Sequence, residues 1–285
     1  MKKTVIRFIC IIAAIAVVLG LLYFYPFSDP SETEAEIETP VQAVETSTEV
    51  STTKPLRDYS AFTGKVRDLV GYLQVPNTTI DDAVVQGTDN SYYLRRSIYG
   101  YYSYSGCYFV DYECDLSKPS QNTVIYGHNL MDSSRLFGQL TRFKSLSFYK
   151  STPVITFDTL QEQMKWKVFA VFQTNNDAED GVLFNFRRAD FASQEDFLYF
   201  IERVRRRALL NIPVDVQEND RILTLVTCDY DINNDWRLVV MARLIRPGES
   251  DEVDVESATI NSNPLYPEGW YRRKGGTRPS YPDEP

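Results

Sequence analysis

Three side chains in this sequence have the types that thiol chemistry needs. His128 is the only histidine and lies in Asn-Thr-Val-Ile-Tyr-Gly-His-Asn, residues 122–129. Cys228 lies in Thr-Leu-Val-Thr-Cys-Asp, residues 224–229, at the end of a predicted strand, and Arg237 follows nine residues later. A thiolate can attack a carbonyl, an imidazole can move protons, and a guanidinium can stabilise an oxyanion. These residues together predict acyl transfer through a cysteine.

The strand pattern around the cysteine predicts that thiol and guanidinium face the same groove. Alternation puts Cys228 on one face of its strand and places Arg237, Val239, Met241 and Arg243 on one face of the next, so Arg237 is expected to point away from an apolar core. If the loop 229–235 joins two neighbouring strands, one strand ends at Cys228 where the other begins at Arg237. An arginine stays charged at any working pH, so it suits the oxyanion, and His128 must carry the protons.

The protonation state of the thiol stays open at this stage. Unperturbed pKa values of about 8.5 for cysteine and about 6.5 for histidine leave only a few per cent of thiolate at neutral pH. Either His128 and Arg237 lower the thiol pKa, or the enzyme works from a minority protonation state. Without context, Cys228 would be a core residue and His128 a structural one.

The folded part is predicted to be mainly β, a closed or nearly closed barrel, because no regular strand-helix-strand rhythm appears. A helix over 57–70 is expected to precede the strands, and a second helix over 194–210, with Ser193 and Asp196 resembling a capping box, is expected before the cysteine strand. Its arginines are predicted to form a solvated face rather than a site for an anionic polymer: Arg203, Arg205, Arg206 and Arg207. The expected strands cover 72–75, 83–86, 107–112, 122–126, 154–158, 165–173, 221–227 and 236–245.

The N-terminal segments predict attachment to a membrane. Basic residues precede an uncharged run over 8–27, which is long enough to span a bilayer, so residues 1–27 are predicted to be an uncleaved signal anchor with a cytoplasmic N-terminus. A cleaved signal peptide is the alternative. Residues 28–55 form an acidic tether of disordered composition, and residues 56–247 form one catalytic domain outside the cell.

Residues 248–285 form a C-terminal extension without an assigned role. Its composition predicts disorder, but Leu265, Tyr266, Trp270 and Tyr271 would be costly to leave fully exposed, so the sequence leaves its placement open.

Charge and cysteine usage exclude several classes of partner. The net charge of −9 comes mainly from the tether and residues 249–256, so nucleic acid is not an expected partner. The cysteines lack zinc-ligand spacing, and we expect no metal or other cofactor. Cys107 and Cys114 are predicted to be two buried thiols, with a disulfide as the alternative.

The sequence resembles the class B sortases over about residues 57–246, in motifs that keep the same order. They are Val75-Pro76-Asn77-Thr78-x-Ile80-Asp81, Val84-Val85-Gln86, Asp89-Asn90-x-Tyr92-Tyr93-Leu94, Gly106-x-x-Phe109-x-Asp111-Tyr112, Tyr126-Gly127-His128-Asn129 with Phe137-Gly138-Gln139-Leu140, and Thr224-Leu225-Val226-Thr227-Cys228-Asp229 with Arg237 and Val239-Val240-x-Ala242-Arg243-Leu244. The helix before the cysteine strand and the signal anchor are also features of that family.

The resemblance implies an eight-stranded sortase barrel and a transpeptidation at the cell wall of a Gram-positive bacterium. A surface protein with a sorting motif such as Asn-Pro-x-Thr-x would be cleaved after threonine as a thioester on Cys228, then passed to an amine of a peptidoglycan precursor or a pilin. His128 and Arg237 match the acid/base and oxyanion positions, and Thr227 matches a residue that holds the motif. Val226 departs from the serine usual at its position, which puts the fine substrate preference in doubt.

Two other functions remain as alternatives. In a cysteine endopeptidase, water would resolve the thioester. In a wall-facing module that binds a peptide, the thiol would be inert and Cys228→Ala would leave function intact. A papain-like enzyme is disfavoured because His128 precedes Cys228 in the chain.

Overall fold

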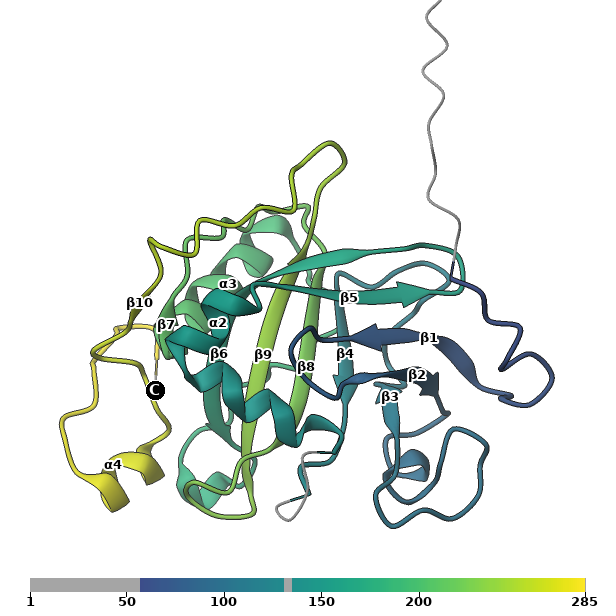
Figure 1. Cartoon of the computed structure of the whole chain (residues 1–285). Helices are drawn as coiled ribbons and strands as arrows, with labels where there is room; N and C mark the ends of the chain where they lie inside the picture. The colour runs from purple at the N-terminus through teal and green to yellow at the C-terminus, as the bar shows by residue number, and fades with distance from the viewer. Residues whose placement is uncertain (1–56, 131–134, 285) are drawn as a thin grey trace, which may run out of the picture. The chain divides into compact units, whose positions relative to one another are not determined.

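Eight strands close into a barrel in this computed structural model, which describes residues 57–130 and 135–284 (Figure 1). The order around the barrel is β1-β2-β3-β4-β8-β9-β6-β5, and β5 pairs with β1. The mainly β prediction and all eight expected strands are confirmed. The strands are β1 Leu69–Gln74, β2 Asp81–Gln86, β3 Tyr108–Val110, β4 Asn122–Tyr126, β5 Val154–Thr159, β6 Lys165–Asn175, β8 Ile222–Cys228 and β9 Trp236–Leu244.

The strands β4 and β8 pair in parallel, which places their C-terminal ends at the same edge of the sheet. Parallel neighbours need a long crossover. Here the crossover runs through the β5–β6 hairpin, the helix α3 Gln194–Arg207 and several short elements, namely η2 Phe137–Lys144, α2 Leu146–Ser151, η3 Ala178–Asp180 and β7 Leu210–Asn211. Because both strands run the same way, their C-terminal ends lie side by side at one rim of the barrel.

The strands β8 and β9 are buried on both faces. Val239 and Met241 share a face of β9 with Arg237 in the alternation, but both are fully buried, whereas Arg237 is only half-buried and lines a pocket. The two buried side chains belong to the same core cluster as Phe197 and Val204 of α3. The helix packs on the neighbouring strand β6, and η2 packs on β8 and β9, so these elements share one core with the two strands.

The inserted helix is α3, Gln194–Arg207, and its predicted cap is present. The Ser193 hydroxyl accepts a hydrogen bond from the amide of Asp196 at 3.2 Å, which satisfies one of the free N–H groups at the helix start. The helix ends at Arg207 rather than at Leu210, because Leu210 pairs in β7 instead.

The arginines of α3 do not form a solvated face, so this prediction is wrong. Arg203 and Arg207 each donate to both carboxylate oxygens of Glu284, at 2.6 to 2.9 Å. Arg206 binds both oxygens of Asp283 at 2.7 and 2.8 Å. The carboxylates that pair with these arginines lie 77 to 81 residues later in the sequence, so the pattern of the helix alone does not reveal them.

The helix expected over 57–70 is also not formed. Residues 59–66 make consecutive hydrogen-bonded turns, in which the amide of Thr63 donates to Tyr59 and that of Val66 donates to Phe62. Gly64 interrupts them with a φ of +72°, in the left-handed region. From Leu69 onward the chain is already in β1, because pairing with β2 and β5 outweighs the local helical pattern.

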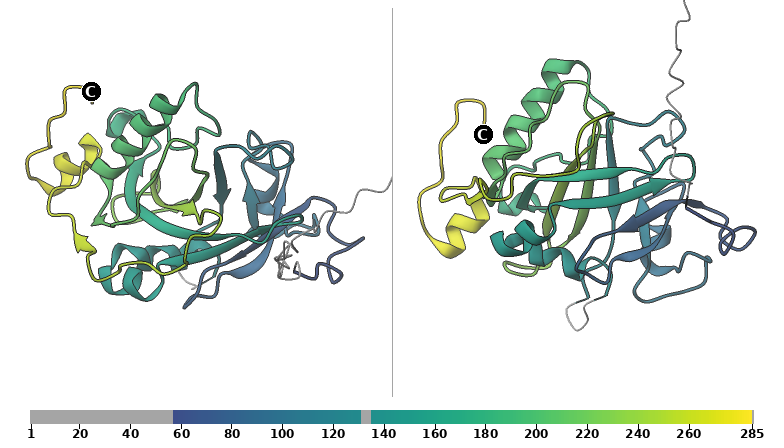
Figure 2. Two further views of the ribbon diagram at one scale, coloured as in Figure 1. Left: turned by 90° about the horizontal axis from the view of Figure 1, so that it is seen from above. Right: turned by 45° about the horizontal axis from the view of Figure 1, so that its top comes forward.

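The C-terminal extension lies against the domain, and Figure 2 shows it, in yellow, on the side that carries α3. Its strand β10, Thr259–Ile260, pairs with β7, and Leu265 is buried. The helix α4, Glu268–Lys274, follows. Trp270 stacks on Tyr266 with 4.3 Å between the ring centroids, so the aromatic cluster is packed.

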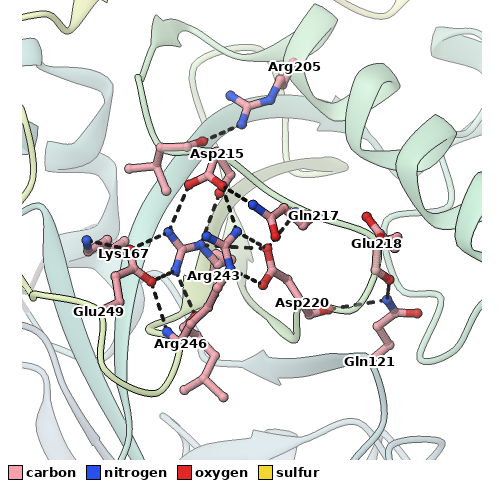
Figure 3. A network of polar contacts seen from close by, with 12 residues as sticks. Gln121, Lys167, Arg205, Asp215, Gln217, Glu218, Asp220, Arg243, Arg246 and Glu249 are labelled. Carbon is pink, nitrogen blue, oxygen red and sulfur yellow. Dashed lines mark hydrogen bonds and ion pairs between the residues drawn. The ribbon is translucent and has the colours of Figure 1, made fainter.

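A buried ionic network joins the start of the extension to the end of β9 (Figure 3). Arg243, with 1% of its side chain exposed, binds Glu249 at 2.8 Å and Asp215 at 3.3 Å. Lys167 also binds Glu249, at 2.7 Å. Burial of an arginine costs free energy unless it is paired, and these partners satisfy it. The network lies roughly 20 Å along β9 from Arg237.

The described thiols are free, as the sequence predicts for Cys107 and Cys114. Burial raises the pKa of each of these two to about 12, so they remain protonated and unreactive. The predicted signal anchor and tether lie outside the described residues. Within residues 57–130 and 135–284, no helix has the length and apolar character needed to cross a bilayer.

Candidate active site

The parallel register of β4 and β8 brings His128 beside Cys228. Tyr126 pairs with Val226, and His128 and Cys228 each lie two residues further along their strands. The amide of Gly127 donates to Val226 at 3.2 Å, and the Asn129 side chain donates to the Cys228 carbonyl at 2.9 Å. The alignment of the strands therefore continues past the end of β4.

Gly127 lets the histidine segment lie directly on two aromatic rings. A Cβ atom at this position would lie 2.7 Å from the ring of Phe137 and 2.9 Å from that of Tyr108. Both rings are buried, so neither has free space to move. The amide of Phe137 also donates to the His128 carbonyl at 2.9 Å. Glycine is thus required for the backbone path that presents the imidazole.

Cys228 and Arg237 are cross-strand partners in the antiparallel β8–β9 pair, as the sequence predicts. The Nη1 atom of Arg237 donates to the carbonyls of Trp236, at 2.9 Å, and Asn234, at 3.1 Å. These bonds hold one edge of the guanidinium against its own loop.

One pocket of about 340 Å³ collects all the predicted site residues. His128, Cys228, Arg237 and Thr227 line it together with apolar and polar side chains from η1 Tyr92–Arg95, β3, β4 and the segment before α3. Its other lining residues are Asn90, Leu94, Phe109, Tyr126, Gly127, Asn176, Phe186, Arg187 and Val226. Apolar walls with a few converging polar groups are typical of a ligand-binding pocket.

The surroundings of His128 favour its neutral form. Burial lowers its pKa below 6.5, and the nearby cations of Arg95 and Arg237 lower it further, against a hydrogen bond to the Leu94 carbonyl that raises it. That bond joins Nε2 to the carbonyl oxygen at 2.9 Å. A carbonyl only accepts, so the proton is on Nε2 and the lone pair of the neutral ring is on Nδ1.

Comparisons with known proteins agree with this geometry. The sortase domain family matches residues 73–245, which is more than half of the chain. The chain belongs to the sortase family. Sortase B of Staphylococcus aureus is 30% identical over 181 residues, covering 63% of this chain and 71% of that protein. Sortase B of Listeria monocytogenes is 29% identical over 180 residues, covering 63% and 70%.

Solved class B structures share the barrel. The Staphylococcus aureus sortase B–substrate complex has a TM-score of 0.60 and 28% identity, and covers 66% of this chain and 84% of that one. Clostridium perfringens sortase B has a TM-score of 0.60 and 32% identity, covering 66% and 100%. The predicted resemblance to class B is therefore confirmed, and this sortase is a cysteine transpeptidase by family.

Thr227 lines the pocket of the sortase, but its hydroxyl is engaged within the protein. The side chain is buried, and Oγ1 donates to the carbonyl of Gly127 at 2.8 Å. This bond ties the cysteine strand to the segment that carries His128. Substrate binding by Thr227 stays a prediction.

Sequence reasoning missed Tyr230, which lies against the thiol. Its hydroxyl donates to the Asn129 carbonyl at 3.0 Å, and its pKa is raised by burial and then by the neighbouring Cys228. The residue lies in the loop between β8 and β9, where no periodic pattern gives it a direction. In the described part of this sortase, no group of three His, Cys, Asp or Glu side chains could hold a metal ion.

Proposed function

We propose that this sortase cleaves surface proteins after the threonine of a sorting motif and transfers them to an amine, with Cys228 as nucleophile, His128 as proton carrier and Arg237 as oxyanion donor. The observation that carries the proposal is the pairing of Cys228 with Arg237 beside His128 in one pocket. Asn-Pro-x-Thr-x is the motif class that the sequence resemblance to class B sortases implies.

The first step forms a thioester. The sulfur of Cys228 bonds to the threonine carbonyl carbon, and the carbonyl oxygen gains the charge that Arg237 faces across the pocket. Removing a single donor to such an oxyanion typically slows turnover by about 100- to 1,000-fold. Collapse of the tetrahedral intermediate breaks the peptide C–N bond and leaves the acyl group on sulfur.

His128 carries the proton between these events. Because burial keeps its imidazole neutral in the free enzyme, it accepts the thiol proton as sulfur attacks and gives that proton to the departing amine. In the second step the incoming amine loses a proton to His128 as its nitrogen bonds to the acyl carbon. The C–S bond then breaks and the thiol is restored.

The acceptor and the location of the enzyme belong to the same proposal. The amine would come from a peptidoglycan precursor or from a pilin. Residues 1–27 would anchor the protein in the cell membrane with a cytoplasmic N-terminus, which places the catalytic domain on the wall side. The basic flank and the uncharged run over 8–27 support this orientation.

The test uses the full chain, wild type and Cys228→Ala, with a panel of Asn-Pro-x-Thr-x peptides, with and without triglycine, read by mass spectrometry. We expect a thioester adduct on Cys228 and a product that ends in threonine linked to triglycine. A product that ends only in the free threonine carboxylate, formed by hydrolysis, would instead identify a cysteine endopeptidase. Binding of the peptides without an adduct, together with full binding by Cys228→Ala, would identify a module that only binds peptide.

A further inference from the structure

The C-terminal extension is connected, through η3, to the loop that immediately precedes the strand of the catalytic arginine. The family match ends at residue 245, so the extension lies beyond it. Its helix α4 packs on η3, the short helix that follows β6. In Figure 1 α4 lies at the same lower edge as the loop between β8 and β9, which contains residues 229–235.

One buried carboxylate connects the two elements. Asp180 of η3 has 4% of its side chain exposed. Its Oδ2 atom accepts from the indole of Trp236 at 2.7 Å and from the side-chain amide of Asn233 at 3.2 Å. Its Oδ1 atom accepts from Arg273 of α4 at 2.6 Å. The loop therefore binds one oxygen of the carboxylate and the extension binds the other.

Gly269 makes the approach of α4 possible. A Cβ atom here would lie 2.3 Å from Oδ1 of Asp180. The same glycine offers its carbonyl to Arg273, at 2.9 Å. The helix can thus press its backbone onto the carboxylate while its own arginine neutralises the charge. A buried carboxylate left without such a partner would be costly.

The path from Asp180 to the active site is short. Asp180 fixes the indole of Trp236 and the side chain of Asn233, and Trp236 is fully buried. The carbonyls of Trp236 and Asn234 accept from the guanidinium of Arg237. Asp180 therefore holds Trp236, which binds Arg237 directly, and Asn233, which is the neighbour of the second residue that binds Arg237.

We propose that the C-terminal extension is part of the catalytic apparatus, with Gly269, Arg273 and Asp180 as positioning residues that hold the β8–β9 loop and so aim Arg237 at the reacting carbonyl. The inference rests on the proposed role of Arg237. None of the three positioning residues lines the catalytic pocket. Displacement of a catalytic group by about 1 Å can cost 100-fold in rate.

The test compares Gly269→Ala and Arg273→Ala with Lys274→Ala, which removes one charge from an exposed position of the same helix. Each is made in the full chain, and transfer of the best-cleaved Asn-Pro-x-Thr-x peptide to triglycine is measured. We expect kcat to fall about 10- to 100-fold in the first two variants, with less change in KM, and to stay at the wild-type value in Lys274→Ala. Thermal unfolding checks that each variant is folded, and Arg273→Ala serves if Gly269→Ala is not.

Two further measurements distinguish a positioning role from a general loss of stability. In an Arg237→Lys background, Arg273→Ala should cause little further loss, because both changes act on one group. The NMR titration midpoint of His128 should move upward in Arg273→Ala, as it should when Arg237 itself is removed. Full additivity of the losses, or an unmoved midpoint, would overturn the positioning role.

The failure of the proposed function would look different. If Arg237→Ala kept wild-type activity, the oxyanion role would be wrong, while the His128 midpoint would still report whether α4 controls the place of the guanidinium. If Arg237→Ala were inactive and Gly269→Ala and Arg273→Ala were as active as wild type, only the positioning role would be lost.

Discussion

Cys228 and Arg237 face each other as partners in the β8–β9 ladder, so the thiol and the cation are joined through backbone hydrogen bonds of the barrel itself. Sites built on strands hold their geometry better than sites built on loops. The guanidinium must still be oriented at its outer end, where it reaches past the strand. That end is held by the carbonyls of Asn234 and Trp236.

The shape of the cation should matter as much as its charge. In Arg237→Lys, the charge remains but the planar fork is lost, so the side chain cannot bond both the loop carbonyls and an oxyanion in the same way. We expect kcat/KM for peptide transfer to fall by about 100-fold or more. The rate at which iodoacetamide alkylates Cys228 serves as a control for an intact thiol. Near-normal transfer by the lysine variant would contradict the oxyanion role.

His128 should titrate below its ordinary range, and as the only histidine it gives a single set of imidazole signals. Burial disfavours the imidazolium and lowers the pKa below 6.5, with Arg95 and Arg237 acting in the same direction. Arg237→Ala removes one of these cations, so the midpoint should rise. Both values are read from the ring proton shifts against pH. A wild-type midpoint at or above 6.5 would show that the ring is solvated.

Gly127→Ala should disable the enzyme without touching a reacting group. The new methyl group would collide with the buried rings of Phe137 and Tyr108, so the backbone before His128 must shift. We expect a loss of about 1–3 kcal/mol in the free energy of unfolding. We also expect a fall of about 10- to 100-fold in kcat.

Gly87→Ala is the matched control for this change, because a Cβ there would meet its nearest atoms at 3.4 Å, an ordinary contact distance. Activity of Gly127→Ala equal to that of Gly87→Ala would mean that the histidine segment tolerates the shift.

Acid should weaken the fold through two glutamates. Glu249 beside Arg243, and Glu284 beside Arg207, have pKa values lowered from 4.5, the latter to about 2. Because the folded state holds the ionised form, this stabilisation is complete above about pH 4.5 and is lost as the pH falls toward 2. Urea unfolding at pH 7, 4 and 3 measures it.

Glu249→Gln should remove part of this acid dependence. We expect it to lower the free energy of unfolding at pH 7 by about 2 kcal/mol, since it weakens a charged hydrogen bond to a buried arginine. Glu252→Gln, at an exposed position nearby, should follow the wild-type curve. An unchanged pH dependence in Glu249→Gln would assign the acid sensitivity to other groups.

The strands and the central site were predictable because their signals are local. Alternation and turn residues mark β8 and β9, and the same alternation correctly pairs Cys228 with Arg237. The helix expected over 57–70 failed because strand pairing of β1 decided its end and Gly64 broke its turns. Local patterns report the preferences of a segment and not the competition of its partners.

Ion pairs between residues distant in the sequence could not be predicted for the same reason. The arginines of α3 look solvated in the sequence, and only the fold brings Asp283 and Glu284 onto them. Asp180 likewise has no motif around it, although it connects α4 with Trp236. Tyr230 lies in a loop, where spacing does not determine a direction.

The order of the site residues along the chain also sets the order in which the site is completed during biosynthesis. The imidazole is synthesised early, the thiol a hundred residues later, and the guanidinium later still. Chains are made from the N-terminus, and contacts between distant segments form late. A growing or interrupted chain therefore carries His128 without Cys228 and Arg237, and the proposed acyl transfer requires the last barrel strand to be in place.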